Sequence, residues 1–193
     1  MLASRSPRRL SLATAEGWTV VVVVPPEEVE SAAAARRPDE SLEAYVSRLA
    51  LAKARAAASL APERAAAGVI LACDTLAEVE GLPLGKPADR GDARRMLGQL
   101  SGRRHRVVSG VCLLPPAGEP LFGTAESILE MGDLSAEFLD WYLDSGMWIG
   151  KAGACGFQDE RLPLRLVSGS PSNVVGLPLE LVRDLLAMLD ARA

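Results

Sequence analysis

Two arginines stand near the start of the chain, in the first turn of a predicted helix. Ser6 has the chemistry of an N-cap, and Pro7 suits the first helical position because its missing N–H leaves no donor unpaired. The helix dipole disfavours Arg8 and Arg9 there by about 0.3–1 kcal/mol each. A phosphate bound at the same place would be held by free N–H groups and guanidinium together. The segment therefore predicts an anion site, and a solvated arginine pair is the alternative.

Other charged side chains could take part in the same chemistry. They are Glu30 after a predicted strand, Lys53 within a helical stripe, Asp74 followed by Thr75, and Lys86 in a Gly-Lys-Pro turn. Lysine and arginine neutralise phosphate oxygens, whereas carboxylates hold a hard cation such as Mg²⁺, which binds through one or two carboxylates plus the substrate. Together these residues predict metal-assisted phosphate chemistry. The alternative for Lys53 is an ammonium at the rim of the protein, with its stem along apolar surface.

The sequence argues against two other kinds of active site, a P-loop and a nucleophilic triad. The segment from Gly81 to Lys86 is similar to a P-loop only superficially, because its glycines are one residue too close and Pro87 stands where a metal-binding serine or threonine belongs. A nucleophilic triad has no Gly-x-Ser-x-Gly elbow to build on, and the single histidine, His105, lies in a predicted strand. We therefore expect a structural role for His105.

Length and composition fit one domain over residues 1–193. With 49% hydrophobic residues the chain can bury a core, and its net charge of -4 argues against a protein that coats the backbone of a nucleic-acid polymer. Three scattered cysteines without C-x-x-C spacing indicate neither a disulfide framework nor a zinc site. The sequence contains no signal region and no apolar run of about 18 residues, so we expect a cytoplasmic protein that does not enter a membrane.

Alternating helices and strands must position the candidate residues, and this alternation is typical of an α/β protein. The expected helices cover residues 8–16, 41–59, 89–100, 135–144 and 178–189, and the expected strands cover 19–24, 68–72, 76–79, 82–84, 105–114, 120–131 and 164–167. The β-branched run over 19–24 predicts a fully buried strand. The strand over 68–72 is expected to present Asp74 and Thr75 at its carboxyl end, where α/β sheets usually bind ligands.

Seven short motifs follow one another along the chain. They are Leu2-Ala3-Ser4-x-Ser6-Pro7-Arg8-Arg9, Leu49-Ala50-x-x-Lys53-Ala54, Ala72-Cys73-Asp74-Thr75, Gly85-Lys86-Pro87, Leu100-Ser101-Gly102-x-x-His105-x-Val107, Lys151-Ala152-Gly153-Ala154-x-Gly156-x-Gln158 and Val175-Gly176-Leu177-Pro178-Leu179. In order and spacing, over essentially the whole chain, this series resembles the Maf family of nucleoside triphosphate pyrophosphatases. The resemblance implies a Maf/Ham1 (ITPase-like) α/β fold, in which a long twisted mixed β-sheet flanked by helices forms two lobes around a nucleotide cleft.

The resemblance also implies an activity. It implies hydrolysis of a nucleoside triphosphate between the α and β phosphates, giving the nucleoside monophosphate and pyrophosphate, with Mg²⁺ or Mn²⁺ as the cofactor, and dTTP and UTP are the substrates of the branch that this chain resembles. Modified pyrimidine nucleotides are further candidate substrates, and a homodimer is the implied assembly. Two alternatives stay open. One is a 7-methyl-GTP pyrophosphatase, and the other is a nucleotide-binding regulator of septum formation and cell division with little turnover.

Matched position by position, the resemblance assigns the catalytic roles. It implies that Asp74 is the catalytic base and that Glu30 helps Asp74 to hold the metal and the attacking water. It also implies that Arg8, Lys53 and Lys86 are the cations that bind phosphate.

Substrate binding and selection are assigned by the resemblance to Ser6, Arg8, Thr75 and Gln158. The last three match the branch that acts on dTTP and UTP, whereas the 7-methyl-GTP branch tends to have an aromatic residue, glutamine and glutamate there. A neutral glutamine amide offers both a donor and an acceptor, so it matches the N3–H and O4 edge of uracil or thymine. The sequence therefore favours a pyrimidine substrate.

Three positions depart from the family pattern. Gly150 stands where an aspartate is common, Cys155 stands where a tyrosine is common, and Gly132 stands where an arginine commonly follows the long hairpin strand. These changes concern the shape of the pocket and the affinity for substrate, and they leave the implied base and the three selectivity positions in place.

Overall fold

The computed structural model of the chain describes residues 1–26, 29 and 36–192. The chain divides into two compact units, each built from several stretches of sequence. Unit 1 consists of Met1–Asp74, Ser109–Ala125 and Gly176–Ala193, and unit 2 consists of Thr75–Val108 and Glu126–Val175. The long strands β3 (Ile70–Val79), β5 (Arg104–Leu114) and β6 (Leu121–Met131) each contribute residues to both units.

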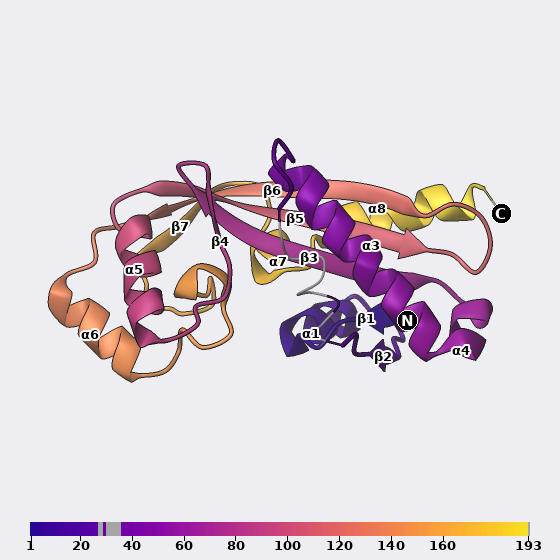
Figure 1. Cartoon of the computed structure of the whole chain (residues 1–193), viewed down its shortest axis with the longest axis horizontal. Coiled ribbons are helices and arrows are strands. Elements are labelled where there is room, and N and C mark those ends of the chain that lie inside the picture. The colour runs from indigo at the N-terminus through magenta and orange to yellow at the C-terminus, as the bar shows by residue number, and fades with distance from the viewer. Residues whose placement is uncertain (27–28, 30–35, 193) are drawn as a thin grey trace. The chain divides into compact units, whose positions relative to one another are not determined.

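Figure 1 labels the strands, which hydrogen-bond in the order β2-β1-β3-β5-β6-β7, with β4 (Leu82–Leu84) pairing with β3. The short strand β1 (Leu2–Ala3) is parallel to β2 (Val22–Val23) on one side and to β3 on the other. By contrast, β7 (Leu164–Ser168) runs antiparallel to β6. The sheet is therefore mixed, as the family resemblance implies.

In unit 1, helices pack on both faces of the sheet. Successive side chains of β3 point to opposite faces, so they contact different helices. The helices described in this unit are α1 (Pro7–Ala15), α3 (Leu42–Leu60), α4 (Pro62–Ala67) and α8 (Leu179–Asp190). Ile70 and Ala72 belong to a buried cluster with the alanines of α3, which crosses these strands in Figure 1. The intervening Leu71 and Cys73 belong to a second buried cluster with α1 and α8. Alternate residues of β3 therefore face different helices.

The backbone of β5 lies against the backbone of α3 at Gly110. A Cβ atom on Gly110 would lie 2.5 Å from the carbonyl carbon of Val46 and 2.6 Å from the nitrogen of Ser47. Glycine is the residue that permits so close an approach. Ser41 begins α3 as its N-cap, and its Oγ accepts a hydrogen bond from the N–H of Ala44 at 3.1 Å. The cap and the close contact together fix where α3 lies on the strand.

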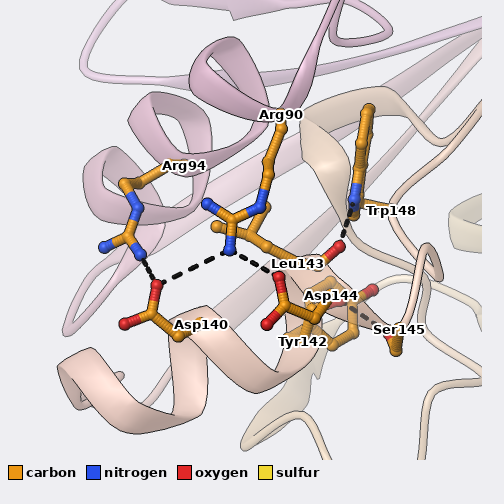
Figure 2. Close-up of polar contacts among 8 residues, drawn as sticks. All are labelled: Arg90, Arg94, Asp140, Tyr142, Leu143, Asp144, Ser145 and Trp148. Atoms are coloured by element: carbon orange, nitrogen blue, oxygen red, sulfur yellow. Dashed lines mark hydrogen bonds and ion pairs between the residues drawn. The ribbon is translucent and has the colours of Figure 1, made fainter.

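Unit 2 has its own buried core and its own helices. Those described are α5 (Arg90–Leu100), α6 (Ala136–Asp144), the short 3-10 helix η1 (Ala152–Ala154) and α7 (Pro171–Val175). Both α5 and α6 contribute to the core. Figure 2 shows the exposed side of their contact, where Arg90 binds Asp144 at 2.6 Å and Arg94 binds Asp140. Exposed ion pairs contribute about 0–1 kcal/mol each, so the apolar contact supplies most of the stabilisation.

The strand expected over residues 19–24 is wrong in both length and burial. The observed strand β2 covers Val22–Val23, and Val21, Val22 and Val24 are 42%, 38% and 46% exposed. Among the described strands, β2 stands at the end of the hydrogen-bonding order, next to β1. A β-branched run is compatible with such an edge position, because β propensity reflects a half-buried pleated surface rather than full burial.

The strand expected over residues 68–72 is longer than predicted. The observed β3 continues through Asp74 and Thr75 to Val79 and joins the strand expected over 76–79. Asp74 therefore lies within a strand rather than at the end of one. A carboxylate can occupy this buried position because a lysine on α3 pairs with it, which the local sequence pattern does not reveal.

The short elements β1, α4, η1 and α7 were not predicted, whereas the other expected elements agree closely with the structure. Each of the other expected helices and strands begins and ends within one residue of its observed bounds. Across residues 1–26, 29 and 36–192, none of the helices combines the length and the apolar character needed to span a lipid bilayer.

Candidate functional site

A lysine and an aspartate form a buried ion pair in unit 1. Lys53 lies on the face of α3 that carries Ala50 and Ala57, and Asp74 lies on the same side of β3 as Ala72, two residues earlier. The Lys53 ammonium donates a hydrogen bond to Oδ1 of Asp74. Only 5% of Lys53 and 9% of Asp74 remain exposed. Lys53 is therefore not a lysine at the rim, and it compensates the carboxylate that β3 buries.

Tyr45 lies on the same buried face of α3, where burial and the charge of Asp74 both affect the pKa of its phenol. Burial raises the pKa of the Tyr45 phenol, and the negative charge of Asp74 raises it further. The Arg48 guanidinium lies 5.3 Å from the centre of the Tyr45 ring and binds Glu40 at 2.7 Å. The hydrogen bond from Arg48 lowers the pKa of Glu40 to about 2. Glu40 is thus paired with arginine, while Asp74 is paired with lysine.

This pair supplies two groups that phosphate chemistry uses. A carboxylate oxygen can bind a hard cation, and it can also accept a proton from a water molecule. A lysine ammonium can bind a phosphate oxygen as a compact positive charge. The pairing of the two groups holds the Asp74 carboxylate in a defined orientation.

The start of α1 places Ser6 and Arg8 in one turn. The Oγ of Ser6 accepts a hydrogen bond from the N–H of Arg9 at 3.4 Å, which makes Ser6 the N-cap as predicted. The Arg9 side chain is engaged elsewhere, because its Nε donates to the Gly176 carbonyl oxygen at 2.7 Å. The Cys73 thiol contacts the same oxygen at 3.3 Å. Arg9 therefore fastens α1 to the segment before α8, and the half-buried Arg8 is the better candidate for binding an anion.

The other candidates that the structure describes belong to unit 2. Thr75 is half-buried in β3, whereas Lys86 and Gln158 are exposed. The Gly85 carbonyl oxygen, next to Lys86, accepts a hydrogen bond from the N–H of Gly153 at 3.0 Å. This bond ties the loop that carries Lys86 to the segment that carries Gln158.

The predicted site is only partly assembled by these contacts. Glu30 lies outside the described residues, so its place beside Asp74 at a metal stays a prediction. Within the described part of the chain, no three or more His, Cys, Asp or Glu side chains are grouped so that they could hold a metal ion. The candidates in unit 1 are Ser6, Arg8, Lys53 and Asp74, and those in unit 2 are Thr75, Lys86 and Gln158. Their action on one ligand stays a prediction as well.

The single histidine is buried in unit 2. His105 is 5% exposed, and burial lowers its pKa to about 4. Within the described residues, its Nδ1 atom has no hydrogen-bond partner. We interpret His105 as a neutral imidazole in the interior, consistent with the structural role expected from the sequence.

Unit 2 contains an ion pair that was not predicted from the sequence. The Lys151 ammonium binds Oδ1 of Asp159 at 2.5 Å. Lys151 belongs to the same motif as Gln158, but no pattern singles out Asp159. The one feature that draws attention to Asp159 is its position directly after Gln158. Contacts of the Asp159 side chain restrain the backbone next to Gln158.

Comparison with known proteins relates the chain to one family. Residues 1–189 match the family model described as Maf-like protein. A dTTP/UTP pyrophosphatase of Symbiobacterium thermophilum is 43% identical over 180 residues, which cover 93% of this chain and 88% of that protein. A dTTP/UTP pyrophosphatase of Sphingopyxis alaskensis is 43% identical over 188 residues, which cover 97% and 94% of the two chains. Among solved structures, the Ham1 protein of Staphylococcus aureus matches with a TM-score of 0.49 and 15% identity, covering 100% of this chain and 98% of that chain.

Proposed function

The chain belongs to the Maf family, and from this premise we propose that it is a nucleoside triphosphate pyrophosphatase acting on dTTP and UTP. The reaction adds water across the bond between the α and β phosphates and yields a nucleoside monophosphate and pyrophosphate. The observation that carries the proposal is the buried contact between Lys53 and Asp74. It joins the proposed base to one of the proposed phosphate-binding cations.

Asp74 is the proposed base. In-line attack on the α phosphorus requires an oriented water molecule and neutralisation of charge on the phosphate oxygens. Asp74 orients this water and accepts its proton as the water oxygen bonds to phosphorus. The bond from phosphorus to the bridging oxygen then breaks, and pyrophosphate leaves. Lys53 holds the Asp74 carboxylate and places a positive charge beside the reacting phosphate.

The oxygen ligands of the proposed site fit a divalent cation that binds together with the substrate. Mg²⁺ prefers oxygen ligands and usually binds through one or two carboxylates, several waters and substrate phosphates. Asp74 supplies one carboxylate, and Glu30 is the proposed second. When bound, Mg²⁺ or Mn²⁺ would supply polarisation of the phosphate oxygens.

Two further cations are proposed to hold the triphosphate. Arg8 lies in the first turn of α1, where the N–H groups of the helix and the guanidinium favour the same anion. Ser6, as the N-cap, fixes the end of this helix and so takes part in substrate binding. Lys86 is exposed on its loop and reaches phosphate as a point charge.

Base selection is proposed to depend on Thr75 and Gln158. The Gln158 amide is exposed and offers a donor and an acceptor, as the N3–H and O4 edge of a pyrimidine requires. A homodimer, which the family resemblance implies, and a cytoplasmic location, which the sequence composition favours, are further proposals. Light scattering after size-exclusion chromatography tests the first.

A substrate panel tests the proposal. The purified chain is incubated with dTTP, UTP, CTP or 7-methyl-GTP in Mg²⁺ or Mn²⁺, and pyrophosphate is measured separately from phosphate. We expect pyrophosphate and nucleoside monophosphate, with dTTP and UTP preferred. A preference for 7-methyl-GTP would overturn the substrate assignment. Metal-dependent nucleotide binding without pyrophosphate release would instead favour the regulatory alternative.

A further inference from the structure

A half-buried carboxylate in unit 2 accepts hydrogen bonds from three separate places in the chain. The Lys151 ammonium lies 2.5 Å from Oδ1 and 2.6 Å from Oδ2 of Asp159. The Tyr142 hydroxyl donates to Oδ2 at 2.5 Å, and the N–H of Gly156 donates to the same oxygen at 3.0 Å. The Lys151 and Asp159 side chains are only 17% and 12% exposed. Asp159 is thus held by a lysine, a phenol and a backbone amide.

The neighbours of this ion pair are neutral. Burial raises the pKa of the Tyr142 phenol, and its hydrogen bond to Asp159 raises it further. Burial, followed by the charge of Asp159, raises the pKa of the Cys155 thiol to about 12. The lysine and the aspartate therefore compensate each other within a polar network, which is a rigid arrangement when its members are hydrogen-bonded.

This network closes the turn that presents Gln158. The N–H of Asp159 donates to the Gly156 carbonyl oxygen at 3.0 Å, and the Asp159 side chain binds the Gly156 N–H in return. Phe157 packs against the core of unit 2, whereas Gln158 is exposed. The turn is thus held by hydrogen bonds between Gly156 and Asp159 and by the packing of Phe157, and it leaves Gln158 exposed.

Gly156 lets the network form. A Cβ atom on Gly156 would lie 2.9 Å from Nζ of Lys151 and 3.0 Å from Oδ2 of Asp159. Any side chain at this position would press on the ion pair. The same segment is anchored at Gly153, whose N–H donates to the Gly85 carbonyl oxygen beside Lys86. The turn with Gln158 and the loop with Lys86 are therefore fixed to one another within unit 2.

We propose that Asp159 is a positioning residue for base recognition, which acts through Gln158 by locking the Gly156–Asp159 turn onto Lys151 and Tyr142. The inference rests on the proposed function and deepens it, because it names what orients the residue proposed to read the pyrimidine. A glutamine on a mobile turn would lose conformational freedom each time it bound a base. The network removes this cost in advance, since the turn is already ordered.

A double-mutant cycle tests the proposal with Asp159→Asn, Gln158→Ala and the double variant. Pyrophosphate release from UTP is measured to give KM and kcat. Loss of one oriented hydrogen bond to the base predicts a rise in KM of about tenfold for each single variant. Asp159→Asn should raise KM more than it lowers kcat. In the Gln158→Ala background, Asp159→Asn should raise KM by less than about twofold, because residues that act through one contact are not additive.

Two further variants serve as controls for the double-mutant cycle. Glu160→Gln removes one charge from the next, exposed position of the same segment and should leave KM at the wild-type value. Tyr142→Phe keeps the buried ring but removes one donor to Asp159, and it replaces Asp159→Asn in the cycle if that variant does not fold. Additive effects of the two substitutions on KM, or a wild-type KM in Asp159→Asn, would overturn the positioning role. A wild-type chain that releases no pyrophosphate from UTP would instead overturn the proposed function itself.

Discussion

Lys53 of α3 and Asp74 of β3 are in hydrogen-bond contact although 21 positions separate them in the sequence. The contact follows from two periodicities. Lys53 is three residues after Ala50 on the helix, and Asp74 is two residues after Ala72 on the strand, so both continue faces that already pack together. The alanines bring the helix close to the strand, and the ion pair extends this contact to the proposed base.

Replacement of Asp74 tests the proposed base. In Asp74→Asn the amide oxygen can still accept the hydrogen bond from Lys53, so we expect the fold to persist. The amide cannot accept the proton of the attacking water, and pyrophosphate release from UTP should slow by about 10²–10⁴-fold. The exposed Asp144→Asn is a matched control and should retain activity. Turnover close to wild type in Asp74→Asn would remove Asp74 from the role of base.

Replacement of Lys53 tests the energetic role of the pair. Lys53→Met leaves the Asp74 carboxylate buried without its compensating charge, so the free energy of unfolding should fall by about 3–5 kcal/mol. Addition of Asp74→Asn removes the uncompensated charge and should restore part of this loss, without restoring activity. Urea unfolding of the two variants measures both effects. Equal stability of Lys53→Met and the wild type would show that the pair contributes nothing to folding.

The contact between Gly110 and α3 should couple packing to activity. In Gly110→Ala the new methyl group meets the backbone of Val46 and Ser47, so the helix must shift at a cost of about 1–3 kcal/mol. Because α3 carries Lys53, kcat should fall as well. The control is Gly98→Ala on the exposed side of α5, where an added Cβ atom would meet no other part of the protein within 4 Å. This substitution should stabilise the chain by about 0.5–1 kcal/mol. Urea unfolding measures the free energy of unfolding of both variants, and pyrophosphate release from UTP measures their kcat. Wild-type stability and wild-type kcat in Gly110→Ala would contradict the coupling.

His105 predicts a pH dependence of stability. Burial lowers its pKa from 6.5 to about 4, so the unfolded chain takes up a proton in this window and the folded chain does not. The contribution is complete above pH 6.5 and is lost as the pH falls toward 4, by about 2 kcal/mol between pH 7 and pH 5. Urea unfolding of wild type and His105→Gln at the two pH values measures it. The variant should lose less stability on acidification, and identical losses would refute the assignment.

The five longer helices of the described chain were predictable because their caps and apolar stripes are local features of the sequence, whereas the short helices α4, η1 and α7 were missed. Ser41 and the apolar stripe of α3 give its bounds and place Lys53 on the inner face. The burial of strands was less predictable, because it depends on neighbours that are distant in sequence. Val22 of β2 is exposed and Val23 is half-buried, since β2 is an edge strand among those described, and no local pattern shows this.

The charged residues of the site also differ in how far they could be predicted from the sequence. The position of Asp74 was predictable as a chemical candidate, but its pairing with Lys53 depends on the packing of α3 against β3. Asp159 carried no recognisable pattern, because its partners Lys151 and Tyr142 are brought to it by the folding of unit 2. The partners of these buried and half-buried carboxylates could therefore not be predicted from the sequence, because the fold brings them together.

Unit 1 joins two segments that lie far apart in the sequence, and this has a consequence for biosynthesis. Leu2 shares a buried cluster with Leu177 and Val182, and Arg9 is fastened to the Gly176 carbonyl. The ribosome makes the whole of unit 2, which ends at Val175, before it makes this last stretch. Leu2 and Arg9 therefore gain these contacts only after the residues of unit 2 have been synthesised, so we expect unit 1 to complete its core after unit 2 has become able to fold.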